Sequence, residues 1–97
     1  MDKSIKVVLK RNKKTISEKD VELKELTIDE ECDKDDIIVE HYNQLLSKDQ
    51  FKGIHKRALK LIRVWTDLTD EELKKWTKDE RMELFRILVF EIDQKKK

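Results

Sequence analysis

Three side chains in this 97-residue sequence could act as nucleophiles or soft metal ligands: Cys32, His41 and His55. Zinc sites and thiol active sites usually hold such residues at short spacings, such as C-x-x-C or H-x-x-x-H. None of the three has a partner at such a spacing, and no carboxylate lies in a context that predicts burial and a raised pKa. We therefore predict no catalytic residue, no cofactor and no metal site, and expect a protein that is not an enzyme. A Cys–His pair assembled by folding is the alternative.

An acidic segment, residues 29–40, resembles a calcium-binding loop in the placement of its acids. Such a loop needs glycine at its sixth position for a sharp turn, and this position holds Lys34. The eighth position, normally aliphatic, is Asp36. Acids are also favoured where a helix begins, because they complement the helix dipole. We interpret the segment as the start of a helix.

A basic segment, residues 51–66, contains no acid and is predicted to be helical. Its cations are Lys52, Lys56, Arg57, Lys60 and Arg63. The three lysines follow one another at intervals of four, so they share one face of the helix. Such a stripe could neutralise phosphates, which predicts a nucleic-acid-binding face. The other interpretation is a solvated face, or one that meets the acidic residues 15–50, where twelve acids accompany four bases.

The last predicted helix, residues 78–93, is apolar over more than half of its circumference. A face that wide is typical either of a central helix or of a surface that meets a partner. As the partner-binding residues we predict Phe85, Ile87, Val89 and Phe90. A contact between copies of the chain is the simplest version of this hypothesis.

The composition of the chain excludes several classes of protein. Charged residues make up 46% of the chain, yet the net charge is only +1, so there is no global signal for a polyanionic partner. A single glycine, Gly53, excludes a glycine-rich phosphate loop. The apolar runs are far shorter than the roughly 20 residues of a membrane span, and the N-terminal residues lack the pattern of a signal peptide. We expect a small cytoplasmic protein that does not enter a membrane.

The spacing of apolar residues along the chain predicts the strands and helices that position these side chains. Apolar and polar residues alternate around a polar turn at 11–14, which predicts a β-hairpin over residues 4–26. Residues 27–93 show helical spacing and predict a bundle of four to five helices, followed by a basic tail at 94–97. The fold class is α+β, mostly α, in a single domain of residues 1–97.

Four capping boxes predict where helices begin. Each pairs a Ser or Thr with a Glu or Gln three residues later, at Thr27, Ser47, Thr69 and Thr77. With the apolar spacing, they predict helices over residues 28–33, 35–46, 48–66, 70–76 and 78–93.

The order of elements resembles the tail assembly chaperones of long-tailed bacteriophages. The residues that carry the resemblance are the strand segments Ile5–Lys10 and Val21–Thr27, then Ala58–Ile62 and the leucine–threonine–acid–acid–acid–leucine entry within Leu68–Trp76. The resemblance implies a hairpin followed by a compact set of helices. It also implies a non-catalytic role, in which a tape-measure or tail-tube protein is kept soluble until the tail assembles.

The sequence thus predicts a non-catalytic protein-binding module, in its most specific form a phage tail assembly chaperone acting in the host cytoplasm. The alternative is a small nucleic-acid-binding protein that uses the basic helix 51–66. A homo-oligomer is compatible with either function.

Overall fold

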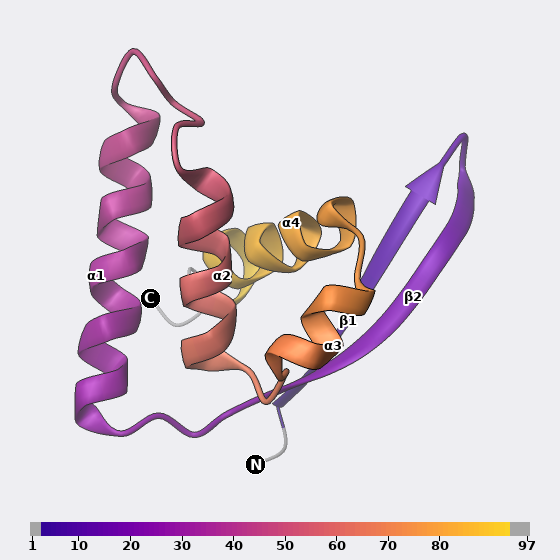
Figure 1. The fold of residues 1–97 in the computed structure, drawn as a ribbon, viewed down its shortest axis with the longest axis horizontal. Coiled ribbons are helices and arrows are strands. Elements are labelled where there is room, and N and C mark those ends of the chain that lie inside the picture. The colour runs from indigo at the N-terminus through magenta and orange to yellow at the C-terminus, as the bar shows by residue number, and fades with distance from the viewer. Residues whose placement is uncertain (1–2, 94–97) are drawn as a thin grey trace.

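The computed structural model describes residues 3–93 of the chain. Two antiparallel strands are followed by four helices, the last of which continues as a π-helix (Figure 1). The bounds are β1 Lys3–Arg11, β2 Lys14–Leu23, α1 Ile28–Leu45, α2 Ile54–Trp65, α3 Asp70–Lys75, α4 Lys78–Arg86 and η1 Ile87–Asp93. The predicted α+β class, a hairpin followed by helices, is confirmed. The predicted basic tail at 94–97 lies outside the described residues.

The hairpin turns at Asn12 and Lys13, which both have positive φ angles, 53° and 67°. Two such residues form the kind of two-residue turn whose twist matches that of the flanking strands. Opposite Leu9 and Lys10 the register shifts, which leaves Ile16 as the extra residue of a β-bulge. The inner face of the hairpin is closed by Val7 and Val21, each 1% exposed in the core. The hairpin therefore packs its apolar face on the helices.

Three of the four predicted capping boxes are present. The hydroxyls of Thr27, Thr69 and Thr77 accept a hydrogen bond from the third backbone amide of α1, α3 and α4, and the glutamate there accepts one from the cap. Each box satisfies two backbone donors that the helix leaves unpaired. Between residues 28 and 45 the helix is continuous, so the prediction of separate helices at 28–33 and 35–46 was wrong.

The fourth capping box, at Ser47, is not formed. The prediction of a helix over 48–66 was therefore wrong about the residue at which this helix begins. The Ser47 hydroxyl donates to the Gln44 carbonyl, and the Gln44 amide donates to Ser47 and to the Asp49 carbonyl. These hydrogen bonds cap the C-terminal end of α1 and do not cap the N-terminal end of α2. The second helix begins only at Ile54, after Gly53 with φ +70°. A left-handed residue interrupts a right-handed helix, and glycine adopts that conformation without steric cost.

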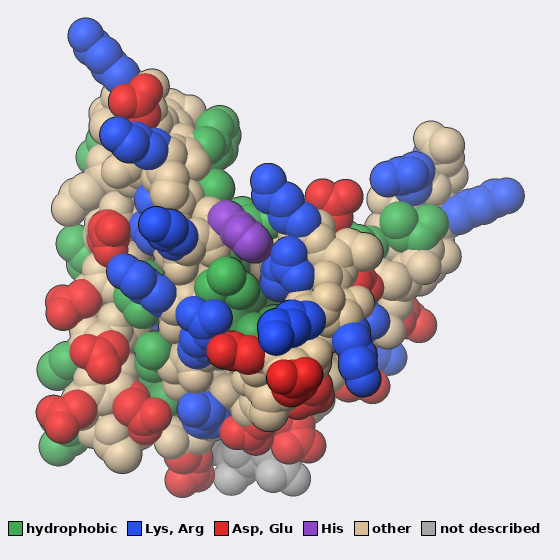
Figure 2. Space-filling model, viewed as in Figure 1, with side chains coloured by type: hydrophobic (Ala, Val, Ile, Leu, Met, Phe, Trp, Pro, Cys, Tyr) green, Lys and Arg blue, Asp and Glu red, His purple; other side chains and the backbone are tan. Residues whose placement is uncertain are grey.

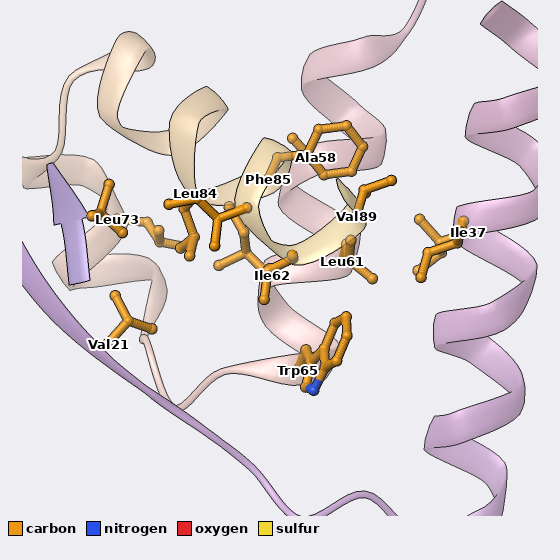
Figure 3. Close-up of a cluster of buried hydrophobic side chains, with 14 of the residues drawn as sticks. Val21, Ile37, Ala58, Leu61, Ile62, Trp65, Leu73, Leu84, Phe85 and Val89 are labelled. Atoms are coloured by element: carbon orange, nitrogen blue, oxygen red, sulfur yellow. The ribbon is translucent and has the colours of Figure 1, made fainter. Parts of the chain in front are cut away.

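The last helix occupies the centre of the helical part. It contacts β1 at one end and α2 along its side, while η1 meets α1 through Phe90, whose ring lies 6.0 Å from that of Tyr42. Figure 3 shows Phe85 and Val89 among core side chains that reach inward from α1 and α2. The wide apolar face therefore belongs to a central helix, one of the two interpretations of its sequence.

Among residues 3–93, no helix combines the length and the apolar character needed to cross a membrane.

Candidate partner-binding surface

The candidate nucleophiles do not converge. Cys32 is exposed on α1, whereas His41 lies on the buried face of the same helix, 2% exposed. His55 lies on α2, half-buried, where its Nε2 accepts a hydrogen bond from Nε of Arg81 at 3.3 Å. Across the part of the chain that the structure describes, no three His, Cys, Asp or Glu side chains come close enough to hold a metal ion.

His41 is held as a neutral side chain in the core. Its Nδ1 accepts a hydrogen bond from Nε of Arg57 at 3.4 Å, and its ring meets Phe85 edge-on at 4.8 Å. Burial, and then the charge of Arg57, lower the pKa of His41 below its usual range. Because this nitrogen already accepts a hydrogen bond from a cation, the pair is suited to joining α1 to α2 and not to proton transfer.

The predicted basic stripe is only partly on the surface. Lys56 and Lys60 are exposed on α2, and Lys52 is exposed in the turn before it. Arg57 is 4% exposed and turns inward to His41, so its assignment to a nucleic-acid-binding face is corrected. Arg63 is exposed, but its Nε donates to Asp70 at 2.9 Å. The three lysines line a hollow of about 430 Å³ that also holds Glu40 and Asp49 from the α1 side, so the stripe faces acids of its own chain.

The predicted partner-binding residues of the last helix require a larger correction. Phe85, Ile87 and Val89 are 2%, 8% and 0% exposed, so they belong to the core and present no surface. Only Phe90 remains accessible, at 37%. The physical reason is the central position of this helix. Other elements pack on several sides of it and cover the apolar face that the sequence predicts to be a partner surface.

A row of exposed apolar side chains lies on α1, for which the sequence predicts no binding face. We define the outer stripe as Ile28, Cys32, Asp35, Val39 and Leu46. Its three aliphatic side chains, at positions 28, 39 and 46, are 79%, 56% and 88% exposed. The core-facing side of the same helix carries Lys34, Ile37, Ile38 and His41. The helix therefore has two apolar faces, and only one is buried within the chain.

Acidic side chains surround the outer stripe. Helix α1 contains seven acids and one base. The base, Lys34, is 6% exposed, with its Nζ 4.6 Å from the ring centroid of Trp65, so it lies on the core side. Figure 2 shows acidic and hydrophobic side chains together over α1, and Lys and Arg side chains gathered over α2. The surface is thus a narrow apolar strip with negative flanks.

One sequence signal could have revealed this surface. Cys32, Val39 and Leu46 recur every seven residues, and Ile28 and Asp35 fall at the intervening positions. This is the spacing of a helix seam that packs against another helix. It was missed because division of the segment into two short helices broke the repeat.

No protein-family model, curated protein or solved structure matches the chain.

Proposed function

We propose that the protein is a non-catalytic protein-binding module, and that the outer stripe of α1 is its binding surface. The supporting observation is the exposure of Ile28, Val39 and Leu46 on a single helix face, in a chain whose charged fraction is 46%. Single exposed apolar residues are ordinary on protein surfaces. Several exposed apolar residues on one face of a helix are typical of a surface that binds another protein. Tyr42 and Phe90, in ring contact at 6.0 Å, extend the apolar surface beside the stripe.

The most specific form of this proposal is a tail assembly chaperone, as the sequence resemblance implies. The client would then be a tape-measure or tail-tube protein, and the site of action the host cytoplasm. A charged body that covers an apolar client segment would delay aggregation of the client until its assembly partners arrive. The charge content of this chain and the stripe on α1 both suit that task.

Co-expression tests the proposal. The neighbouring reading frames are searched for a tape-measure or tail-tube protein, and absence of one counts against the chaperone form. The chain is then produced together with that client, and the soluble fraction of the client is measured. Wild-type protein is expected to keep the client in solution. A variant with Val39→Gln and Leu46→Gln is expected to lose this effect while folding normally, because both sites are exposed and glutamine is a good helix former.

The matched control is Ile16→Gln, which removes another exposed aliphatic side chain, at the hairpin bulge and outside the stripe. It should behave as wild type. If the Val39→Gln/Leu46→Gln variant protects the client as well as wild type does, α1 is not the binding surface. If wild-type protein leaves the client insoluble, the chaperone form of the proposal is wrong.

The second candidate is nucleic-acid binding through α2 and the turn before it, supported by the exposed side chains of Lys52, Lys56 and Lys60, which line one hollow. Phosphate contacts release counterions, so affinity for a DNA or RNA duplex would fall steeply between low and physiological salt. Replacement of the three lysines by glutamine would abolish that binding. The Val39→Gln/Leu46→Gln variant would leave it unchanged, which separates the two functions.

A further inference from the structure

The spacing and charges of the outer stripe indicate which kind of partner it can bind. This inference rests on the proposed function, because both concern the same face of α1. Cys32, Val39 and Leu46 occupy one position of a seven-residue repeat, while Ile28, Asp35 and Tyr42 occupy the other, and the ring of Tyr42 contacts Phe90 of η1. Two helices that pack in parallel or antiparallel fashion interlock through such positions. The geometry therefore suits a helix, laid along α1, better than an extended segment.

The charge around the stripe restricts which helix can bind. Acids flank the seam on both sides, with Glu31 exposed on one side and Asp36 on the other. In paired helices the residues that flank the seam face one another, and their charges set partner choice. On the flank that holds Asp36, cations of the chain itself lie near, because Lys60 and Arg63 of α2 line one hollow with Asp36. The outer side of α1 has no base of its own, since Lys34 lies on the core side, so lysine or arginine of a partner would complement the exposed acids there.

Asp35 adds a requirement within the seam itself. Its side chain is 66% exposed, and its Oδ1 lies 3.6 Å from Nζ of Lys34. When a partner covers the stripe, this carboxylate loses water, and burial of a charge is costly unless an opposite charge is supplied. Lys34 supplies an opposite charge from one side. A cation of the partner placed over the exposed side of Asp35 would supply a second and would fix the register of the two helices.

A second copy of this chain does not meet these requirements. Two α1 helices packed through the stripe would set acids against acids, and like charges across an interface oppose binding. The basic helix α2 of another copy offers cations, but its apolar residues Ala58, Leu61 and Ile62 are each 0% exposed in the core. It has no apolar face left with which to fill the seam.

We propose that the outer stripe binds a basic amphipathic helix of another protein. This helix carries apolar residues at heptad spacing, lysine or arginine on its flanks, and one cation opposite Asp35.

Three synthetic peptides test the proposal against the full-length chain. The basic peptide has leucine at both seam positions of three heptads and lysine at the flanks, and the acidic peptide replaces these lysines by glutamate. The third peptide is a scrambled form of the basic one. Fluorescence anisotropy at physiological ionic strength should give a dissociation constant about tenfold or more lower for the basic peptide than for either of the others.

Variants assign the binding to the stripe. The Val39→Gln/Leu46→Gln variant should weaken binding of the basic peptide about tenfold, whereas Ile16→Gln should not. A variant with Asp35→Lys and Asp36→Lys should reverse the preference toward the acidic peptide. Circular dichroism of each variant verifies that it is folded.

Other results would overturn the inference. Equal binding of the scrambled peptide would mean that charge alone drives association, without a seam. Self-association of the wild-type chain that Val39→Gln/Leu46→Gln abolishes would identify a second copy as the partner. If a client depends on Val39 and Leu46 in the co-expression assay but only the acidic peptide binds, the proposed function stands and this inference fails. If neither the client nor any peptide responds to these substitutions, both fail.

Discussion

Arg57 of α2 donates a hydrogen bond from its Nε to Nδ1 of His41 on α1, at 3.4 Å, with both side chains almost fully buried. The same guanidinium donates from Nη1 to the Lys52 carbonyl at 2.6 Å. One cation thus joins α1, the turn before α2, and α2 itself. The residue that the sequence assigned to a binding face serves to hold the two helices together.

This pairing makes stability depend on pH. The pKa of His41 is lowered by burial and then by Arg57, whereas an unfolded chain protonates histidine near pH 6.5. Below that pH the unfolded state binds more protons than the folded state, so the free energy of unfolding should fall as the pH falls through about 6.5. It should level off once the pH lies below the folded pKa. Urea unfolding at several pH values between about 7.5 and 5 measures this slope.

The His41→Gln variant serves as the control for the slope. It should flatten the slope, because the titrating group is gone. A slope of wild-type size in the His41→Gln variant would assign the pH dependence to other groups.

Leu88 and Leu46 provide a matched comparison of core and surface. Leu88 is 0% exposed on the last helix, and Leu46 is 88% exposed at the end of α1. Leu88→Ala should lower the free energy of unfolding by about 2–5 kcal/mol, as expected for a buried leucine. Leu46→Ala should change it by no more than about 0.5 kcal/mol. Thermal and urea unfolding give both values, and similar costs at the two sites would contradict the central placement of the last helix.

Gly53 should resist substitution by residues with a β-carbon. A β-carbon at this site would meet only Nη1 of Arg57, at 3.5 Å, which is an ordinary contact. The cost of Gly53→Ala is therefore one of backbone conformation, about 1–2 kcal/mol for a left-handed residue. Gly53→Asn should cost less, because asparagine tolerates this region better. Chemical denaturation of both variants compares them. An alanine variant as stable as wild type would show that α2 can begin without the left-handed residue.

Glu80 combines a capping role with an ion pair. It is 5% exposed, accepts from the Thr77 amide at 2.7 Å, and lies 3.5 Å from Nζ of Lys19 on the hairpin. Burial opposes ionisation, but the Thr77 amide, the Ser17 hydroxyl and the Lys19 ammonium outweigh it and hold the pKa of Glu80 below its usual value.

Glu80→Ala should destabilise the fold by about 2 kcal/mol, because it removes a cap and leaves Lys19 without this carboxylate. The matched control is Glu72→Ala, which removes the glutamate of an equivalent capping box at an exposed site of α3. It should cost less. Equal losses in urea unfolding would mean that the contact between hairpin and α4 adds nothing to the cap.

Much of the fold could be predicted because its signals are local. The turn at Asn12 and Lys13, the three threonine caps and the apolar spacing of the last helix all depend on residues within a few positions of one another. The misplaced start of α2 has a local cause as well. At Ser47 two hydrogen-bonding patterns compete, one that opens a helix and one that closes the preceding helix, and the sequence does not rank them.

The candidate surface could not be predicted in the same way. Apolar side chains at helical spacing give the same sequence pattern whether their helix face is buried by other elements or exposed to solvent. The sequence predicts Phe85 and Val89 as a partner surface, but both are buried, and it gives no prediction for the exposed Val39 and Leu46. Which helix lies at the centre depends on contacts between segments far apart in the chain.

The element types, the hairpin turn, three helix starts and the absence of a glycine-rich loop can all be read from the chain, since each follows from residue types, backbone preferences and short-range hydrogen bonds. Three features depend on how the elements pack in space: which apolar faces are buried, the inward turn of Arg57 to His41, and the open stripe that α1 retains. The physical reason is that burial is a property of packing: water is excluded by neighbours that the local sequence does not specify.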